Sequence, residues 1–302
     1  MIINPPRRHP NLSVAIPASL VTDIPHLREK TAKIGFLGRA LAIFRIEEVI
    51  IYPDQLGEDQ KREINLLSTI LSYMETPQYL RKQLFKIRPE LRYAGTLPPL
   101  RTPHHPLRNR IRDLKPGEYR ESIVRSLDKR GAYVEIGVER PILVPHLQAP
   151  VSTRLTVRIT KTGKHPKAVP ADRNEIEDYW GYTVTISKEP FVRMVETESF
   201  DLVMATSRRG TDFVKISDGL KEKIKRSERV LVAFGAPTEG LYDIAKREGV
   251  KLDSIADYVI NTIPNQATET VRTEEALYAT LSLLNMLAEK TNFITGSQVG
   301  LK

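Results

Sequence analysis

The feature that most limits the fold is an alternation of strand and helix patterns that breaks off in mid-chain and later resumes. Residues 12–20 and 47–52 are short apolar runs typical of buried strands, whereas 23–44 and 58–75 carry apolar residues at helical spacing. This β-α-β-α order predicts an α/β fold, a mostly parallel sheet with helices on both faces. The pattern returns near residue 181, with strands expected at 181–187, 201–207, 229–235 and 257–263 and helices at 188–199, 238–249 and 273–289.

The middle of the chain cannot continue this alternation. Residues 94–110 are rich in proline, which disfavours both a helix and a central strand. Residues 117–160 then show short strand patterns separated by turn signals, typical of a small antiparallel β-barrel. Residues 164–175 read as a polar linker.

This interruption predicts two domains. The first is a discontinuous α/β domain of residues 1–98 and 175–302. The second is a β-barrel of residues 99–174 that is inserted into it. A chain of 302 residues is long enough for both.

The positive charge is concentrated around the start of the barrel. Residues 79–130 hold 14 Lys and Arg against 5 Asp and Glu, an excess that equals the net charge of +9 of the whole chain. A merely basic surface is one explanation. Because the whole excess falls in one sixth of the chain, the sequence favours an anionic polymer as partner, and nucleic acid is the leading candidate.

Other classes of site have little support in the composition. The chain has no cysteine, and its six histidines form no HExxH pattern, so we expect no metal site. No apolar run approaches the length needed to cross a bilayer, and the N-terminus lacks a signal-peptide apolar region. We therefore expect a soluble cytoplasmic protein without membrane contact.

Nucleotide-binding motifs are incomplete. The segment GAPTEG at 235–240 has the glycine spacing of a phosphate loop but lacks the following Lys-Ser/Thr, and the chain has no GxGxxG. A nucleotide-dependent hydrolase is therefore disfavoured. Three loops, at 206–210, 235–240 and 261–273, nevertheless follow strands, where open α/β sheets bind ligands. Their backbone groups and small hydroxyls suit a neutral, adenosine-like ligand, although well-capped connections would look the same.

Four ordered blocks carry a resemblance to a known family. They are AGTLPPLRTPHHP, DLVMATSRRG, VAFGAPTEGL and INTIPNQATETVRTEEAL, and they resemble the archaeal and eukaryotic RNA methyltransferase branch of the SPOUT (α/β-knot) superfamily. The resemblance covers nearly the whole chain. It implies a trefoil-knot domain that binds S-adenosylmethionine, interrupted by an OB-like barrel. It also implies a homodimer in which the C-terminal helix lies near the interface and the partner completes the active site.

The resemblance also assigns roles to positions. The implied cofactor-binding residues are Thr206, Ser207, Gly235, Gly240, Ile260, Asn261, Thr262, Ile263, Pro264, Val271 and Thr273. The catalytic candidates are Arg208, Arg209 and Arg272, because an arginine can hold a target phosphate or stabilise a deprotonated base. The RNA-binding candidates are Arg101, His104, His105, Arg108, Arg110, Arg112, Arg120, Arg125, Lys129 and Arg130.

Two functions follow from this set of features. The first is an S-adenosylmethionine-dependent RNA methyltransferase that acts on structured RNA, either rRNA or tRNA, by in-line displacement at a dimer interface. The alternative is a non-enzymatic RNA-binding or ribosome-assembly factor that keeps the knot as a scaffold. No general base is evident in the sequence.

Overall fold

The computed structural model of the chain describes residues 5–295, with side chains for residues 5–287. These residues divide into two compact units, which we call the sheet unit and the barrel unit. The sheet unit comprises residues 8–71, 93–98 and 182–295, and the barrel unit comprises residues 5–7, 72–92 and 99–181.

The sheet unit is built on six strands in the order β11-β9-β10-β1-β2-β8, and every neighbouring pair is parallel. The predicted parallel sheet is thus confirmed. The strands are β1 (Asn11–Pro17), β2 (Glu48–Tyr52), β8 (Thr183–Ile186), β9 (Leu202–Asp212), β10 (Arg229–Ala233) and β11 (Tyr258–Asn261). The helices of this part of the chain are α1 (Leu27–Ile43), α2 (Lys61–Glu75, whose last turn enters the barrel unit), α4 (Phe191–Thr197), α5 (Phe213–Arg226), α6 (Leu241–Arg247) and α7 (Thr273–Thr295).

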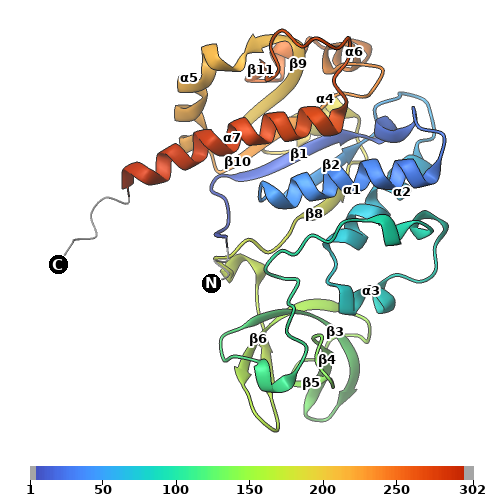
Figure 1. Cartoon of the computed structure of the whole chain (residues 1–302), viewed down its shortest axis with the longest axis vertical. Helices are drawn as coiled ribbons and strands as arrows, with labels where there is room; N and C mark the ends of the chain where they lie inside the picture. The colour runs from blue at the N-terminus through green and yellow to red at the C-terminus, as the bar shows by residue number, and fades with distance from the viewer. Residues whose placement is uncertain (1–4, 296–302) are drawn as a thin grey trace. The chain divides into compact units, whose positions relative to one another are not determined.

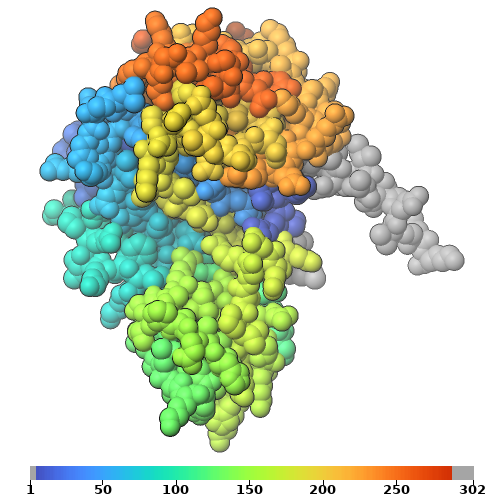
Figure 2. Space-filling view, turned by 180° about the vertical axis from the view of Figure 1, so that it is seen from behind, coloured from blue at the N-terminus to red at the C-terminus, as the bar shows by residue number. Residues whose placement is uncertain are grey.

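Apolar side chains on both faces of the strands explain why helices cover the sheet twice. Successive strand residues point to opposite faces, so a central strand buried on both sides must be apolar throughout. Ala15 and Val203 pack in a cluster with Phe191 of α4 and Leu241 of α6. In Figure 2, seen from behind, the yellow and orange surface of residues 190–250 covers this face. In Figure 1, α1 and α7 cross in front of the strands.

The largest departure from the expected elements of this unit lies after β9. The strand was expected to end at residue 207, but it runs to Asp212 and leads directly into α5, a helix that the sequence pattern did not predict. The interpretation of 206–210 as a simple loop is therefore wrong. The last residues of the strand rejoin the sheet, because Thr211 and Asp212 pair with β11.

The barrel unit is a closed five-stranded barrel in the order β3-β4-β5-β7-β6. Its strands are β3 (Tyr119–Asp128), β4 (Gly131–Glu135), β5 (Ile142–Pro145), β6 (Arg154–Lys161) and β7 (Lys167–Pro170), and the short helix α3 (Gln78–Leu84) belongs to the same unit. Four of the five pairings are antiparallel, and β5 with β7 is parallel. Val134 and Val157 are among the buried residues of its core.

The expected polar linker contains the strand that closes this barrel. Residues 164–175 include β7, which pairs with β6 on one side and with β5 on the other. Only Ala168 of its four residues is buried, so the strand has too little apolar pattern to be recognised. The prediction of a linker is wrong at these positions.

Candidate functional site

The ligand-binding candidate in the sheet unit begins with an irregularity in β9. Strand β11 pairs Val259 with Ala205 and then Ile260 with Thr211, so residues 206–210 leave the ladder between the two pairs. Gly210 lies where the chain returns. A Cβ at Gly210 would stand 2.7 Å from the carbonyl oxygen of Val259, so only glycine allows this approach of backbone to backbone.

Three segments meet at this excursion and enclose a cavity of about 350 Å³. One is the excursion of β9 itself, and the other two follow β10 and β11. All three lie toward the carboxyl edge of the parallel sheet, as expected for ligand sites in open α/β folds. The lining residues are Thr206, Ser207, Arg208, Arg209, Phe234, Gly235, Ala236, Pro237, Thr238, Glu239, Gly240, Asp243, Ile260, Asn261, Thr262, Ile263, Gln266, Glu269, Thr270, Val271, Thr273 and Ala276.

Hydrogen bonds tie the three segments to one another. The hydroxyl of Thr206 donates to the carbonyl oxygen of Ala233 at 2.9 Å, and the amide of Asn261 donates to the carbonyl oxygen of Arg208 at 3.1 Å. The hydroxyl of Thr273 donates to the carbonyl oxygen of Gly235 at 3.3 Å. Because each bond joins two different segments, the cavity wall is fixed without a glycine-rich loop.

The segment after β11 makes its turns with asparagines. The backbone N–H of Ile263 donates to the side-chain oxygen of Asn261 at 3.0 Å, and Asn265 has a positive φ of 58°, a conformation that asparagine tolerates better than most residues. The hydroxyls of Thr262 and Thr280 lie 2.9 Å apart and join this segment to α7. These contacts explain how a loop without glycine can form a cavity wall.

The structure brings most of the candidate site residues together. All eleven cofactor candidates except Pro264 line the cavity, and so do the catalytic candidates Arg208 and Arg209. Pro264 and Arg272 are not among the lining residues. The backbone N–H of Arg272 donates to the carboxylate of Glu275 at 2.9 Å, a bond that closes the first turn of α7, and the Arg272 side chain is exposed.

The two remaining arginines make different contacts. A guanidinium N–H of Arg208 donates to the carbonyl oxygen of Glu269 at 2.8 Å and so joins the excursion of β9 to the segment before α7. Arg209 instead pairs with the carboxylate of Asp243 at 3.1 Å, and its guanidinium lies 4.7 Å from the ring centre of Tyr242. Arg208 therefore links two segments of the cavity wall, whereas Arg209 forms a half-exposed ion pair with Asp243.

Sequence reasoning missed the three carboxylates that line the cavity. Glu239 pairs with Arg247 at 2.7 Å, Asp243 pairs with Arg209, and Glu269 lies on the segment before α7. The available signal was Asp243, the acidic residue in the first turn of α6, in the segment TEGLYD. Position alone did not reveal it, because an acidic residue in the first turn of a helix also favours the helix dipole.

In the barrel unit, seven of the ten RNA-binding candidates are exposed, His105 is half-buried and two are buried. Arg101, Arg108, Arg110, Arg112, Arg125, Lys129 and Arg130 are exposed. His104 and Arg120 are buried, with 0% and 1% of their surface accessible, so the prediction that they contact RNA is wrong for this structure. The side chain of Arg120 is used internally, since it donates to the carboxylate of Glu118 and to the carbonyl oxygen of Arg108.

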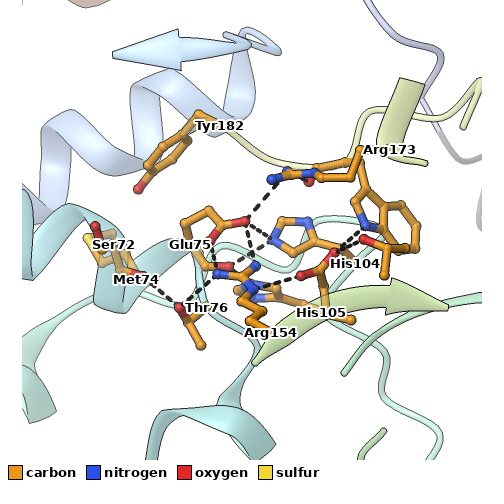
Figure 3. A network of polar contacts seen from close by, with 12 residues as sticks. Ser72, Met74, Glu75, Thr76, His104, His105, Arg154, Arg173 and Tyr182 are labelled. Atoms are coloured by element: carbon orange, nitrogen blue, oxygen red, sulfur yellow. Dashed lines mark hydrogen bonds and ion pairs between the residues drawn. The ribbon is translucent and has the colours of Figure 1, made fainter. Parts of the chain in front are cut away.

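The two adjacent histidines belong to a buried polar network in the barrel unit (Figure 3). The Nε2 atoms of His104 and His105 donate to the same carbonyl oxygen, that of Glu75, at 2.8 and 2.7 Å. Burial lowers the pKa of each histidine to about 3. Both rings are therefore neutral near pH 7, and His105 has no positive charge to offer to a phosphate.

Arg154 holds the acidic members of this network. It donates to the carboxylates of Glu75 and Glu121, each at 2.7 Å, and Glu121 also accepts from Trp180 and Thr156. Burial alone would raise the pKa of Glu121, but Arg154 and the hydrogen bonds outweigh it and lower the pKa to about 2. Most of the polar groups of the network are paired with one another, although the buried Nδ1 of His104 has no hydrogen-bond partner, and we interpret the network as structural.

Neither a metal site nor a membrane-spanning helix is found in the described part of the chain. Residues 5–295 contain no group of three or more His, Asp or Glu side chains arranged to hold a metal ion. Within the same residues, no helix combines the length and apolar character that crossing a membrane requires.

The family model and the human relative that match this chain both point to RNA methyltransferases. Residues 11–284 match the model of the family described as "Putative RNA methyltransferase". An uncharacterized protein of Halobacterium salinarum is 33% identical over 293 residues, which span 91% of this chain and 98% of that protein. The 28S rRNA (uridine-N(3))-methyltransferase of Homo sapiens is 31% identical over 305 residues, which span 90% of this chain and 77% of that protein.

Among solved structures, a "probable methylase family protein" of Haemophilus influenzae is similar with a TM-score of 0.39 and 9% identity. The similarity covers 97% of this chain and 70% of that one. At this TM-score, it carries no argument about the site.

Proposed function

We propose, since this chain belongs to the family described as "Putative RNA methyltransferase", that it transfers a methyl group from S-adenosylmethionine to RNA. The observation that carries the proposal is the cavity at the carboxyl edge of the sheet, which is formed by the three segments that the SPOUT resemblance assigns to the cofactor. A chain with that family membership and without such a cavity would fit the non-enzymatic alternative better.

The residues of the cavity fit this methyl donor. A volume of about 350 Å³ lies within the ordinary range of small-molecule sites. The donor carries a neutral adenosine and a positive sulfonium but no phosphate, so fixed backbone groups and hydroxyls can hold it without a glycine cradle. The cavity carboxylates add negative charge near the cation.

Individual residues then take specific tasks in binding. Gly235 and Gly240 keep the segment after β10 close to the cavity, and Thr206 and Thr273 fix its walls through their hydroxyls. The segment 260–263 would line the adenosine. When bound, the donor supplies an electrophilic methyl group, and the protein contributes chiefly by holding the RNA nucleophile in line with it.

We also propose the trefoil knot of the SPOUT superfamily for the sheet unit. The strand order supports it, because the chain must pass from β10 across β9 to reach β11 at the edge of the sheet. Helix α7 then turns back and packs against α1. A chain end that threads through a loop in this way makes a knot. Knots are rare in proteins, and the hydrophobic pattern does not require one.

A homodimer formed through α1 and α7 fits the exposed apolar side chains of these helices. Phe36 and Ile43 of α1 are 59% and 49% exposed, and Met286 of α7 is 58% exposed. The opposite side of α7 is anchored in the core by Leu277 and Leu281. The family resemblance suggests the occupant of the apolar surface, which is a second copy of this chain.

For the substrate, we propose rRNA held by the exposed basic residues of the barrel unit. Arg108, Arg110 and Arg112 follow one another along a segment of that unit, and the guanidinium of Arg130 lies 5.7 Å from the ring centre of Tyr133. Basic side chains that contact phosphates supply most of the affinity for RNA, and aromatic rings add stacking. We infer uridine N3 as the target atom, since the human relative carries that specificity in its name.

Calorimetry with S-adenosylhomocysteine tests the proposal. We expect micromolar affinity for the unmodified protein, and a loss of at least about tenfold in Ala276→Phe, because the added ring would fill the cavity that Ala276 lines. Val214→Phe on α5 places the same ring at a side chain that is 79% exposed and serves as the control. Absence of binding to the unmodified protein, or equal affinity in both variants, would contradict the cavity as cofactor site.

A further inference from the structure

Two side chains of opposite charge, those of Arg209 and Asp243, form an ion pair at the opening of the cavity. Arg209 comes from the excursion of β9, and Asp243 comes from the first turn of α6. One guanidinium nitrogen of Arg209 lies 3.2 and 3.1 Å from the two carboxylate oxygens of Asp243. Their side chains are 54% and 51% exposed, so both can meet a molecule that arrives from solvent.

Neighbouring groups hold this pair in position. The guanidinium of Arg209 lies 4.7 Å from the ring centre of Tyr242, and the hydroxyl of Tyr242 is 3.2 Å from the carboxylate of Asp253. The backbone N–H of Arg209 donates to the hydroxyl of Ser207 at 3.1 Å, which fixes the backbone that carries the guanidinium. An ordinary surface ion pair has freely rotating side chains, whereas stacking and hydrogen bonds restrict this one.

The other carboxylate near α6 is already committed. Glu239 pairs with Arg247 at 2.7 Å, and Arg247 also donates to the carbonyl oxygen of Asp54 at 2.5 Å. Glu239 therefore links the cavity wall to the body of the sheet unit. Asp243 is the carboxylate whose cationic partner, Arg209, also lines the cavity.

A donor beside an acceptor matches one nucleobase edge in particular. The imide edge of uracil presents the N3–H donor between the O2 and O4 acceptors, whereas cytosine presents an acceptor at N3 beside a donor amine. The carboxylate of Asp243 can accept from N3–H while the guanidinium of Arg209 donates to a flanking carbonyl. The same two groups would meet cytosine N3 with repulsion between lone pairs.

We propose that the Arg209–Asp243 pair reads the imide edge of the target uridine and that Asp243 is the general base that takes its N3 proton. The inference rests on the proposed function and adds a catalytic residue to it. The N3–H bond breaks, its proton passes to the carboxylate of Asp243, and its electron pair stays on N3 as the nucleophile. Arg209 stabilises the negative charge that spreads to the neighbouring oxygen.

The charges balance over the reaction. N3 gains the methyl group of a sulfonium donor, whose carbon–sulfur bond breaks and leaves a neutral thioether. The positive charge lost by the donor and the negative charge lost by the carboxylate cancel. Because Asp243 is half exposed, it can afterwards release the proton to solvent.

The test compares Asp243→Asn with Asp243→Ala, and uses Glu222→Gln as the matched control. Glu222 also forms an exposed ion pair, with Lys225 on α5, and does not line the cavity. The substrate probe is total RNA from cells that lack the gene, assayed for N3-methyluridine. We expect Asp243→Asn to slow methyl transfer by about 100-fold or more while affinity for S-adenosylhomocysteine changes less than about twofold. Glu222→Gln should be fully active.

Two further readouts separate proton transfer from a structural role. RNA made with 5-fluorouridine, whose N3–H is more acidic, should recover part of the activity that Asp243→Asn removes. In the protein saturated with S-adenosylhomocysteine, uridine monophosphate should shift the NMR signals of the cavity more than cytidine monophosphate does. Asp243→Asn should keep this preference, because an amide oxygen still accepts from N3–H, and Asp243→Ala should abolish it.

The outcomes distinguish this inference from the function on which it rests. Unmodified protein that makes no methylated RNA and binds no S-adenosylhomocysteine overturns both. An active unmodified protein with an equally active Asp243→Asn variant overturns only the role of Asp243. The same holds if 5-fluorouridine recovers none of the activity, or if both monophosphates shift the signals equally.

Discussion

The two units use the same residue types, arginine and acidic side chains, in opposite ways. In the barrel unit, Arg154 joins Glu75 and Glu121 in the interior, where the acidic side chains are 6% and 3% exposed. In the sheet unit, Arg209 and Asp243 are about half exposed at the opening of a cavity. A buried pair must be fully partnered to exist at all, whereas a half-exposed pair can exchange its partner for a ligand.

Exposure, more than a shifted pKa, distinguishes the candidate site from the buried network. The network has strongly shifted pKa values, which often mark active sites. Most of its hydrogen-bonding groups are directed at one another, however, and His104 has no accessible surface. The Arg209–Asp243 pair combines cavity lining with exposure, so we assign chemistry to the sheet unit and architecture to the network.

The largest expected effect comes from breaking the buried network. Arg154→Met removes the cation closest to the buried carboxylates of Glu75 and Glu121 and leaves only the longer contact of Arg173 with Glu75 at 3.7 Å, which should lower the free energy of unfolding by about 3–5 kcal/mol. Urea denaturation measures it. Arg130→Met, which removes an exposed pair with Asp128, is the control and should change stability far less than Arg154→Met does, because solvent screens the exposed pair. Equal effects of the two substitutions would mean that the buried network is not structural.

Acid should weaken the same unit through its histidines. The pKa values of His104 and His105 are about 3 in the folded protein against an ordinary 6.5, so the unfolded chain binds more protons between these values. Stability is therefore complete above pH 6.5 and falls below it by up to about 1.4 kcal/mol per pH unit for each histidine. Glu121, with a pKa of about 2, adds to the decrease below pH 4.5.

Denaturation curves at pH 7 and pH 5 measure this dependence. His105→Gln keeps a donor for the carbonyl oxygen of Glu75 but cannot titrate, so it should have roughly half the pH slope. A stability that is the same at pH 7 and pH 5 in the unmodified protein would contradict the neutral, buried state of both rings.

A smaller effect is expected at the excursion of β9. Gly210→Ala would place a Cβ 2.7 Å from the carbonyl oxygen of Val259, which should cost about 1–3 kcal/mol of stability and move the cavity wall. Calorimetry should then find weaker binding of S-adenosylhomocysteine. Gly95→Ala is the matched control, because a Cβ there has no neighbour within 4 Å. Unchanged affinity in Gly210→Ala would separate the excursion from the cofactor site.

The smallest expected effect concerns the exposed arginines of the barrel unit. Replacing Arg108, Arg110 and Arg112 with glutamine should leave folding intact, since all three are exposed. It should flatten the dependence of RNA affinity on salt by roughly 0.7 for each phosphate that the variant no longer neutralises. Filter binding at several salt concentrations measures the slope. An unchanged slope would move the RNA-binding surface away from this segment.

The parallel sheet could be predicted well because buried strands must be apolar on both faces. A short apolar run such as residues 47–52 favours a buried strand in a chain of alternating strands and helices, and β2 matches this prediction closely. The four-residue strand β7 escaped notice because only Ala168 is buried. A strand whose pairing comes from distant partners leaves little local signal.

The candidate site was only partly predictable for the same reason. The loops after β10 and β11 could be placed because strand ends are local features. The excursion of β9 at 206–210 was mistaken for a loop, because the register shift between Val259 and Ile260 is a property of two strands together. Burial of His104 depends on a partner 29 residues away, Glu75, which no local pattern indicates. The pairing of Asp243 with Arg209 joins residues 34 apart in sequence and leaves no local pattern.

The central claim is tested most directly by nucleoside mass spectrometry of RNA from cells that lack the gene. The proposed function predicts that one N3-methyluridine of rRNA disappears and returns when the unmodified gene is restored. It should not return with the Ala276→Phe variant, whose added ring fills the cavity. A nucleoside profile that is identical with and without the gene would contradict the assignment of this chain as an RNA methyltransferase.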